Sequence, residues 1–89
     1  MASNKWSVYT GSQIMPRKYY RIVSRQYAVR RARIVAGYTS TELSEAIGIS
    51  RPMLSSIENG AGTSVKTAHR IADALAKSFE DLFDVLDTR

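Results

Sequence analysis

Residues 39–60 encode two short helices joined by a tight turn, and this segment constrains the fold more than any other. Thr39 and Glu42 have the spacing of a capping box, in which each side chain accepts the other residue's backbone N–H. Leu43 and Ile47 lie four residues apart and share one face of the helix that follows. Gly48 comes next, and a residue without Cβ readily adopts the left-handed conformation that ends a helix.

The second helix of this pair also has a recognisable start, buried face and end. Ser50 can cap it, and Pro52 falls in its first turn, where a missing N–H costs nothing. Leu54 and Ile57 form its apolar face, and Asn59 precedes a glycine at its end. Its other face carries small polar and basic side chains. This is the construction of a helix-turn-helix that places its second helix in the major groove of DNA.

The segment resembles the Cro/repressor-type helix-turn-helix family, also called the lambda-repressor-like or XRE family. The positions that carry the resemblance are Ser40, Ser44, Gly48, Ile49, Ser50, Ile57, Glu58 and Gly60. The resemblance continues through residues 29–38 on one side and 64–83 on the other. Two places depart from the family pattern. Ser40 stands where Gln is usual, and Ala76-Lys77 stand where Gly and an apolar residue are usual.

Charge is distributed unevenly along the 89 residues. Residues 1–36 contain eight Lys and Arg and no acidic residue, whereas residues 37–89 contain five basic and eight acidic residues. Positive charge concentrated in one half is typical of a protein that binds a polyanion. A solvated basic helix without a partner is the alternative, and the helix-turn-helix pattern favours nucleic acid over it.

Composition argues against several other classes of protein. The chain has no cysteine, and His69 has no second ligand at metal-binding spacing, so neither a disulfide nor a metal site is expected. One His and no Cys do not supply a nucleophile, a base and an orienting group, so we predict no enzyme activity, cofactor or small-molecule ligand. With no apolar run of about 18 residues and no signal-peptide core, we expect no membrane association. The predicted location is the bacterial host cytoplasm, in association with the nucleoid.

The hydrophobic spacing predicts an all-α fold of five helices, without β-type alternation. Residues 1–15 are interpreted as a flexible N-terminal arm, and residues 16–89 as the helix-turn-helix domain. The expected helices span about residues 17–36, 40–47, 51–59, 65–76 and 79–86. The first is long and basic, either continuous or broken near Ser24. Its predicted apolar stripe comprises Tyr20, Val23, Tyr27 and Ile34, extended by Val29, Ala32 and Ala36.

Exposed side chains of the two-helix motif are the candidate DNA contacts. Helical spacing and the resemblance indicate a base-reading set comprising Arg51, Pro52, Met53 and Ser56. An Arg at the start of such a helix can bind guanine O6 and N7 with two hydrogen bonds, and a phosphate contact is the alternative. The expected phosphate contacts are Ser40, Thr41, Ser50 and Asn59, together with Arg17, Lys18, Arg21 and Arg25.

Two further sets of residues are assigned structural roles. The resemblance implies an ion pair between Arg33 and Glu58 that joins the first and third helices, with two independent surface charges as the alternative. An apolar cluster in the last helix predicts a dimer interface, because it exceeds what one neighbouring helix can cover. This cluster comprises Phe79, Leu82 and Phe83. Closure of the monomer core by the same aromatic residues is one alternative, and a contact through residues 6–9 is the other.

Together these features predict a sequence-specific, double-stranded DNA-binding transcriptional regulator of the repressor or Cro kind. We expect it to bind a pseudo-palindromic operator as a homodimer. The resemblance implies a bacteriophage or prophage source. The alternatives are a DNA-binding antitoxin of a toxin–antitoxin pair, and a phage recombination or architectural DNA-binding factor.

Overall fold

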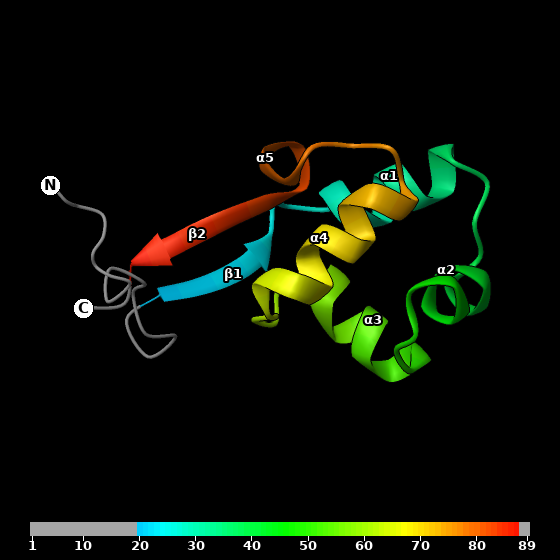
Figure 1. The fold of residues 1–89 in the computed structure, drawn as a ribbon, viewed down its shortest axis with the longest axis horizontal. Helices are drawn as coiled ribbons and strands as arrows, with labels where there is room; N and C mark the ends of the chain where they lie inside the picture. Colours follow the sequence, from blue (N-terminus) through cyan, green and yellow to red (C-terminus); the bar gives the residue numbers. More distant parts are fainter. Residues whose placement is uncertain (1–19, 88–89) are drawn as a thin grey trace, which may run out of the picture.

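The computed structural model describes residues 20–87, which form five helices and a two-stranded antiparallel sheet (Figure 1). In chain order the elements are β1 (Tyr20–Ser24), α1 (Ala28–Val35), α2 (Ser40–Ile47), α3 (Arg51–Glu58), α4 (Val65–Ala74), α5 (Phe79–Leu82) and β2 (Phe83–Asp87). The helices pack together, and the two strands run side by side away from α2. Within residues 20–87, no helix has the length and apolar composition to span a membrane.

The caps predicted for the two central helices are present. The Oγ1 of Thr39 accepts the backbone N–H of Glu42 at 3.1 Å, and the Glu42 carboxylate accepts the N–H of Thr39 at 2.9 Å. Gly48 ends α2 with a φ of 76°. The Oγ of Ser50 accepts the N–H of Met53 at 3.1 Å, which starts α3. The helix-turn-helix therefore begins, turns and continues at the predicted residues, and α3 ends one residue early.

The expected first helix is wrong over its N-terminal half. Within the described part of residues 17–36, β1 comes first and α1 begins only at Ala28. The β-branched Ile22 and Val23 favour a strand only mildly, and pairing with β2 from the other end of the domain decides the outcome. Tyr27 adopts a φ of 60° just before α1, a left-handed conformation that no helix interior accommodates. The chain does break near Ser24, but a strand rather than a second helix precedes the break.

The last helix is also shorter than predicted, and the fold is not purely all-α. In place of a helix over residues 79–86, α5 is a single turn and the chain continues as β2. Ser78 caps the start of α5, since its Oγ accepts the N–H of Asp81 at 3.2 Å. In the sheet, Ile22 lies opposite Val85. The domain is therefore mostly helical with a small two-stranded ribbon, the name we use for β1 and β2 together.

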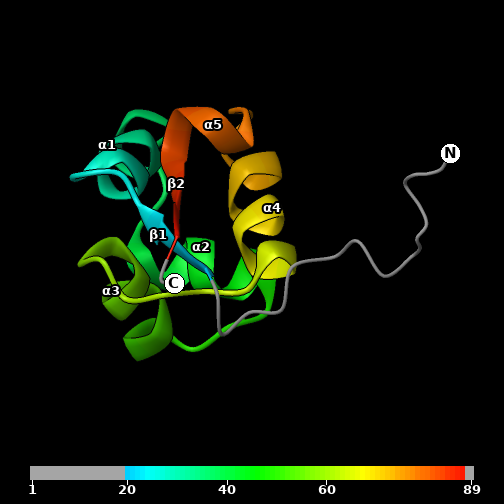
Figure 2. The same cartoon turned by 90° about the vertical axis from the view of Figure 1, so that its left-hand side faces the viewer.

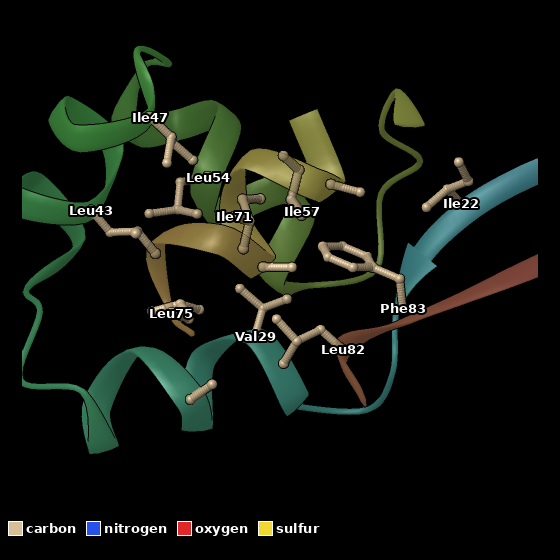
Figure 3. Close-up of a cluster of buried hydrophobic side chains, with 13 residues drawn as sticks. Ile22, Val29, Leu43, Ile47, Leu54, Ile57, Ile71, Leu75, Leu82 and Phe83 are labelled. Atoms are coloured by element: carbon tan, nitrogen blue, oxygen red, sulfur yellow. The ribbon is translucent and has the colours of Figure 1, made fainter. Parts of the chain in front are cut away.

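The hydrophobic core lies where the helices meet the base of the ribbon (Figure 3). Its buried side chains are Ile22, Val29, Ala32, Leu43, Ile47, Leu54, Ile57, Ala68, Ile71, Ala72, Leu75, Leu82 and Phe83. The predicted inward faces of α2 and α3 are confirmed by this set. The predicted stripe of the first helix is wrong at Tyr27 and Ile34, which are 58% and 62% exposed. A helix that starts at Ala28 and packs on α3 and α5 turns Val29 and Ala32 inward, so the predicted stripe is confirmed at these two residues.

The aromatic residues predicted to form a dimer interface close the core of the monomer. Leu82 and Phe83 are buried, so they are not available as a docking surface, and that prediction is wrong for both. Phe79 is half-buried, and its ring stacks between those of His69 and Phe83, with centroid distances of 4.9 and 5.5 Å. The change from helix to strand at Phe83 is the physical reason, because it directs this side chain beneath the ribbon rather than outward.

The joint between α4 and α5 has an unusual backbone. After α4, the N–H of Lys77 donates to the C=O of Ala72 at 2.9 Å, and Ala76 adopts a φ of 55°. This bonding pattern is the Schellman motif, in which glycine is favoured at the left-handed position. The end of α1 shows the same arrangement with Gly37, whose φ is 84°. The family pattern's usual glycine is therefore replaced here by an alanine in the same conformation.

Candidate nucleic-acid interface

The outward face of α3 carries the four predicted base-reading residues. Arg51, Pro52, Met53 and Ser56 are all exposed, while Leu54 and Ile57 hold the opposite face of the helix in the core and so form the inward side. Met53, the apolar residue with the longest side chain in this set, is half exposed. Viewed along the ribbon, α3 lies at the outer edge of the molecule, with no other element covering its far side (Figure 2). Within residues 20–87, no acidic side chain pairs with Arg51.

The start of α2 and the first turn of α3 meet at a shallow surface hollow. Its lining residues are Ser40, Arg51, Pro52 and Ser55. The N-terminal end of a helix attracts anions, because its first N–H groups have no partner within the helix. The exposed Thr41 lies in the same first turn of α2. The structure thus brings a predicted phosphate-binding end beside a predicted base-reading Arg.

Ser55 is a site residue that the sequence analysis did not select. It is exposed and lies one turn beyond Arg51, so both side chains lie on the side of α3 that faces α2. The spacing of four residues was the available signal. Ser50, in contrast, uses its hydroxyl oxygen to cap α3, and its side chain therefore has a structural partner already.

The predicted ion pair between Arg33 and Glu58 is present. Arg33 Nε lies 2.7 Å from Glu58 Oε2, and the side chains are only 13% and 4% exposed. Arg33 also donates to the backbone C=O of Tyr38 at 3.1 Å. One guanidinium therefore joins α1, the loop before α2 and the last turn of α3. This contact fixes the orientation of α3 relative to the rest of the domain.

Arg30 takes part in the same cluster, which the sequence analysis did not foresee. Its Nε lies 3.6 Å from Glu58 Oε1, and its Nη2 donates to the amide oxygen of Asn59 at 3.3 Å. Arg30 precedes Arg33 by three residues, the spacing that places two side chains on one helical face. Asn59 remains exposed at the end of α3 as a candidate phosphate contact, with its amide oriented by Arg30.

Within residues 20–87, the predicted basic face of the first helix is not formed, because Arg21 lies on β1 and Arg25 precedes α1. Arg21 is exposed on β1 beside the loop that follows α3, where a Cβ added to Gly62 would lie 3.4 Å from Arg21 Nε. Arg25 instead forms an ion pair with Asp84 at 3.2 Å, across the ribbon. Arg17, Lys18 and the predicted arm over residues 1–15 lie outside the described residues. Of the two basic candidates within residues 20–87, Arg21 is therefore the one that lies near α3.

Comparison with known proteins identifies the architecture. The family model described as Helix-turn-helix matches residues 29–82. None of the curated proteins matches the sequence. The crystal structure of the transcriptional regulator VanUg is similar, with a TM-score of 0.58 and 18% sequence identity. The alignment covers 91% of this chain and 96% of that one, and at this identity it shows a shared fold.

Proposed function

This chain belongs to the helix-turn-helix family, and on that premise we propose that it is a sequence-specific, double-stranded DNA-binding transcriptional regulator. The observation that carries the proposal is the surface formed by α3 and the start of α2. It presents an unpaired Arg, small polar side chains and a helix N-terminus on one side of the molecule. Such groups can donate hydrogen bonds to base edges in the major groove and to backbone phosphates.

In the proposed complex, α3 lies in the major groove and its first turn reads the bases. Arg51 donates two hydrogen bonds to the O6 and N7 of a guanine. The side chains of Pro52 and Met53 have no hydrogen-bond donor, and they contact thymine methyl groups or sugars. Ser56, one turn beyond Pro52, gives weaker discrimination because a hydroxyl both donates and accepts. Arg51 is therefore the main specificity residue.

Phosphate contacts set the register of α3 in the groove. The N–H groups at the start of α2, with the hydroxyls of Ser40 and Thr41, bind one backbone phosphate. Asn59 binds another at the far end of α3, and Arg21 extends this contact along the backbone. These contacts add affinity without sequence preference, and they make binding salt-dependent.

A single α3 reads only a few base pairs, so two copies on a pseudo-palindromic operator would double the specific contacts. We therefore extend the proposal to a homodimer that acts as a repressor of the Cro kind and blocks access to a promoter. The resemblance of the helix-turn-helix to phage repressors supports a phage or prophage source.

Selection of bound DNA from a random library tests the proposal. An enriched site with two-fold symmetry is the expected result, whereas an enriched asymmetric site would favour a recombination or architectural factor. The absence of any enriched sequence would contradict sequence-specific binding.

Substitution of Arg51 tests the assignment of the reading residue. The Arg51→Ala protein should bind its selected site about 1–3 kcal/mol more weakly and lose preference at one base pair in each half-site. Arg31→Ala is the matched control, since Arg31 is equally a surface Arg but lines the α1–α5 groove. If Arg51→Ala weakens selected and random DNA by the same factor, Arg51 contacts a phosphate instead.

A further inference from the structure

The outward face of α1 carries apolar side chains where a surface helix normally carries polar ones. Ile34 and Val35 are 62% and 78% exposed, and Tyr27, which precedes the helix, is 58% exposed. Arg31 is also exposed, and it lies three residues before Ile34 and four before Val35, so these side chains are neighbours on one face. Single exposed apolar residues are common on protein surfaces, but a group of neighbouring ones marks an interaction site.

This face of α1 points away from the candidate DNA-binding face. Arg33 lies two residues beyond Arg31 and contacts Glu58 of α3. Side chains two residues apart on a helix point in nearly opposite directions, so Arg31 is directed away from α3. In both views of the fold, α1 and α5 lie in the upper part of the molecule and α3 in the lower part (Figure 1, Figure 2).

A groove between α1 and α5 runs beside the same face. Ala28 and Ala32 line it from α1, and Leu82 lines it from α5. Val35 borders both the groove and the outward face of α1, so the two form one continuous apolar surface. Because the two alanine side chains are short, side chains of another helix can enter the groove as that helix packs along α1.

Two cations without partners border the groove. Arg31 and Lys77 are exposed, and within residues 20–87 neither side chain forms an ion pair or a hydrogen bond. The acidic residue at the groove is Asp81, whose carboxylate accepts the backbone N–H of Ser78 at 3.4 Å in the cap of α5. Two free cations against one engaged carboxylate leave the border of the groove positive. A complementary ligand therefore combines apolar side chains with carboxylates.

We infer that this surface, the outward face of α1 together with the α1–α5 groove, binds an acidic amphipathic helix of a partner protein. Apolar side chains spaced three and four residues apart on that helix contact Ile34 and Val35 and enter the groove. Its carboxylates pair with Arg31 and Lys77. The eight residues of α1 span about 12 Å, so roughly two turns of the partner helix lie in contact.

Other occupants complement this surface less well. Residues 1–19 of the chain contain three basic and no acidic residues, so they would bring positive charge to a positive border. A second copy that used the same surface would likewise place positive charge against positive charge, because a two-fold contact joins identical patches. DNA supplies negative charge but no apolar side chains to cover Ile34 and Val35.

Selection of helical peptides from a displayed library tests this surface, and it requires no DNA. The library presents one randomised helical face on a rigid helical hairpin, and the wild-type protein is the target. Enriched peptides should carry apolar residues three and four positions apart, flanked by Asp or Glu. Failure to enrich any peptide, or enrichment of basic peptides, would refute the inference.

Variants of the domain then locate the site of an enriched peptide by fluorescence anisotropy. Val35→Ser should weaken binding about tenfold, the effect of failing to bury one valine side chain. Arg31→Glu should weaken it at least as much, because it places a carboxylate against carboxylates. Val65→Ser and Lys66→Glu, at exposed positions of α4, are the matched controls and should bind normally. Full binding by Arg31→Glu, or equal weakening by the controls, would overturn the assignment.

A further variant separates this surface from the candidate DNA-binding face. An acidic peptide could also bind a DNA-binding face by imitating the phosphates of DNA, and Arg51 would then be required. Arg51→Ala should bind the enriched peptide as tightly as the wild-type protein does. Loss of peptide binding in Arg51→Ala would place the peptide on α3 and refute the inference. Failure to select a DNA site would refute the proposed function and leave this surface unaffected.

Discussion

The helix-turn-helix and the ribbon are held in place by different kinds of contact. In α2 and α3, each boundary is fixed by a residue within one helical turn of it, such as Thr39, Gly48 or Ser50. The ribbon instead pairs β1 with β2, the first and last elements of the described chain, and Phe83 anchors it in the core. Local contacts thus shape the candidate DNA-binding face, while the pairing of two distant segments closes the domain. Substitutions in the two regions should therefore differ in how much stability they remove and in how far the effect extends.

The largest effect is expected where the ribbon enters the core. Phe83→Ala removes a buried ring and should lower the free energy of unfolding by about 3–5 kcal/mol, as for other buried aromatic residues. Urea denaturation followed by circular dichroism measures this loss. Val35→Ala, at a position 78% exposed on α1, is the control and should cost far less. Equal losses from both would show that Phe83 does not anchor the ribbon.

A somewhat smaller loss is expected from the buried ion pair that orients α3. Arg33→Met keeps the apolar stem of the side chain but leaves Glu58 buried, and it should cost about 3 kcal/mol. This is the low end for a broken buried pair, because Arg30 still lies close to Glu58. Arg31→Met, at an exposed position of the same helix, should change stability little. A neutral Arg33→Met would mean that α3 is oriented by apolar packing alone.

Loss of the cap of α3 should have a modest and local effect. Ser50→Ala removes the acceptor for the N–H of Met53 and should cost about 1 kcal/mol. Ser55→Ala, on the exposed face of the same helix, should leave the unfolding midpoint unchanged. Amide exchange of Met53 should accelerate in the first variant and not in the second. Faster exchange throughout the ribbon as well would contradict the local character of this contact.

The smallest expected change is a gain in stability. Ala76 holds a left-handed conformation that costs a residue with Cβ, so Ala76→Gly should stabilise the domain by roughly 0.5–1 kcal/mol. Ala74→Gly, at the last residue of α4, should instead destabilise, because glycine has a low helix propensity. Thermal unfolding of the two variants gives shifts of opposite sign if the backbone is as described. A lower midpoint for Ala76→Gly would show that its conformation carries no strain.

The contrast between the regions also explains what the sequence could predict. The spacing around Thr39, Gly48 and Ser50 determines α2 and α3, because caps act on residues close in sequence. The ion pair of Arg33 followed from the family resemblance. The strands could not be predicted, since Tyr20 and Val23 fit a helical stripe as well as a strand until β2 is placed beside them. The predicted dimer interface was wrong at Leu82 and Phe83, because the predicted helix does not continue beyond Leu82.

The pairing of β1 with β2 has a consequence for the order in which the domain folds. It joins the most distant described elements, so its contacts carry the highest loop-closure cost and should form after the helices. Pulse-labelled exchange would show protection of Val23 and Asp84 later than protection of Leu54 in α3. During synthesis, β1 emerges from the ribosome first and must wait for β2. Until β2 pairs with β1, Ile22 and part of the helical core remain exposed to solvent. A nascent chain paused before β2 is synthesised would therefore be a target for chaperones.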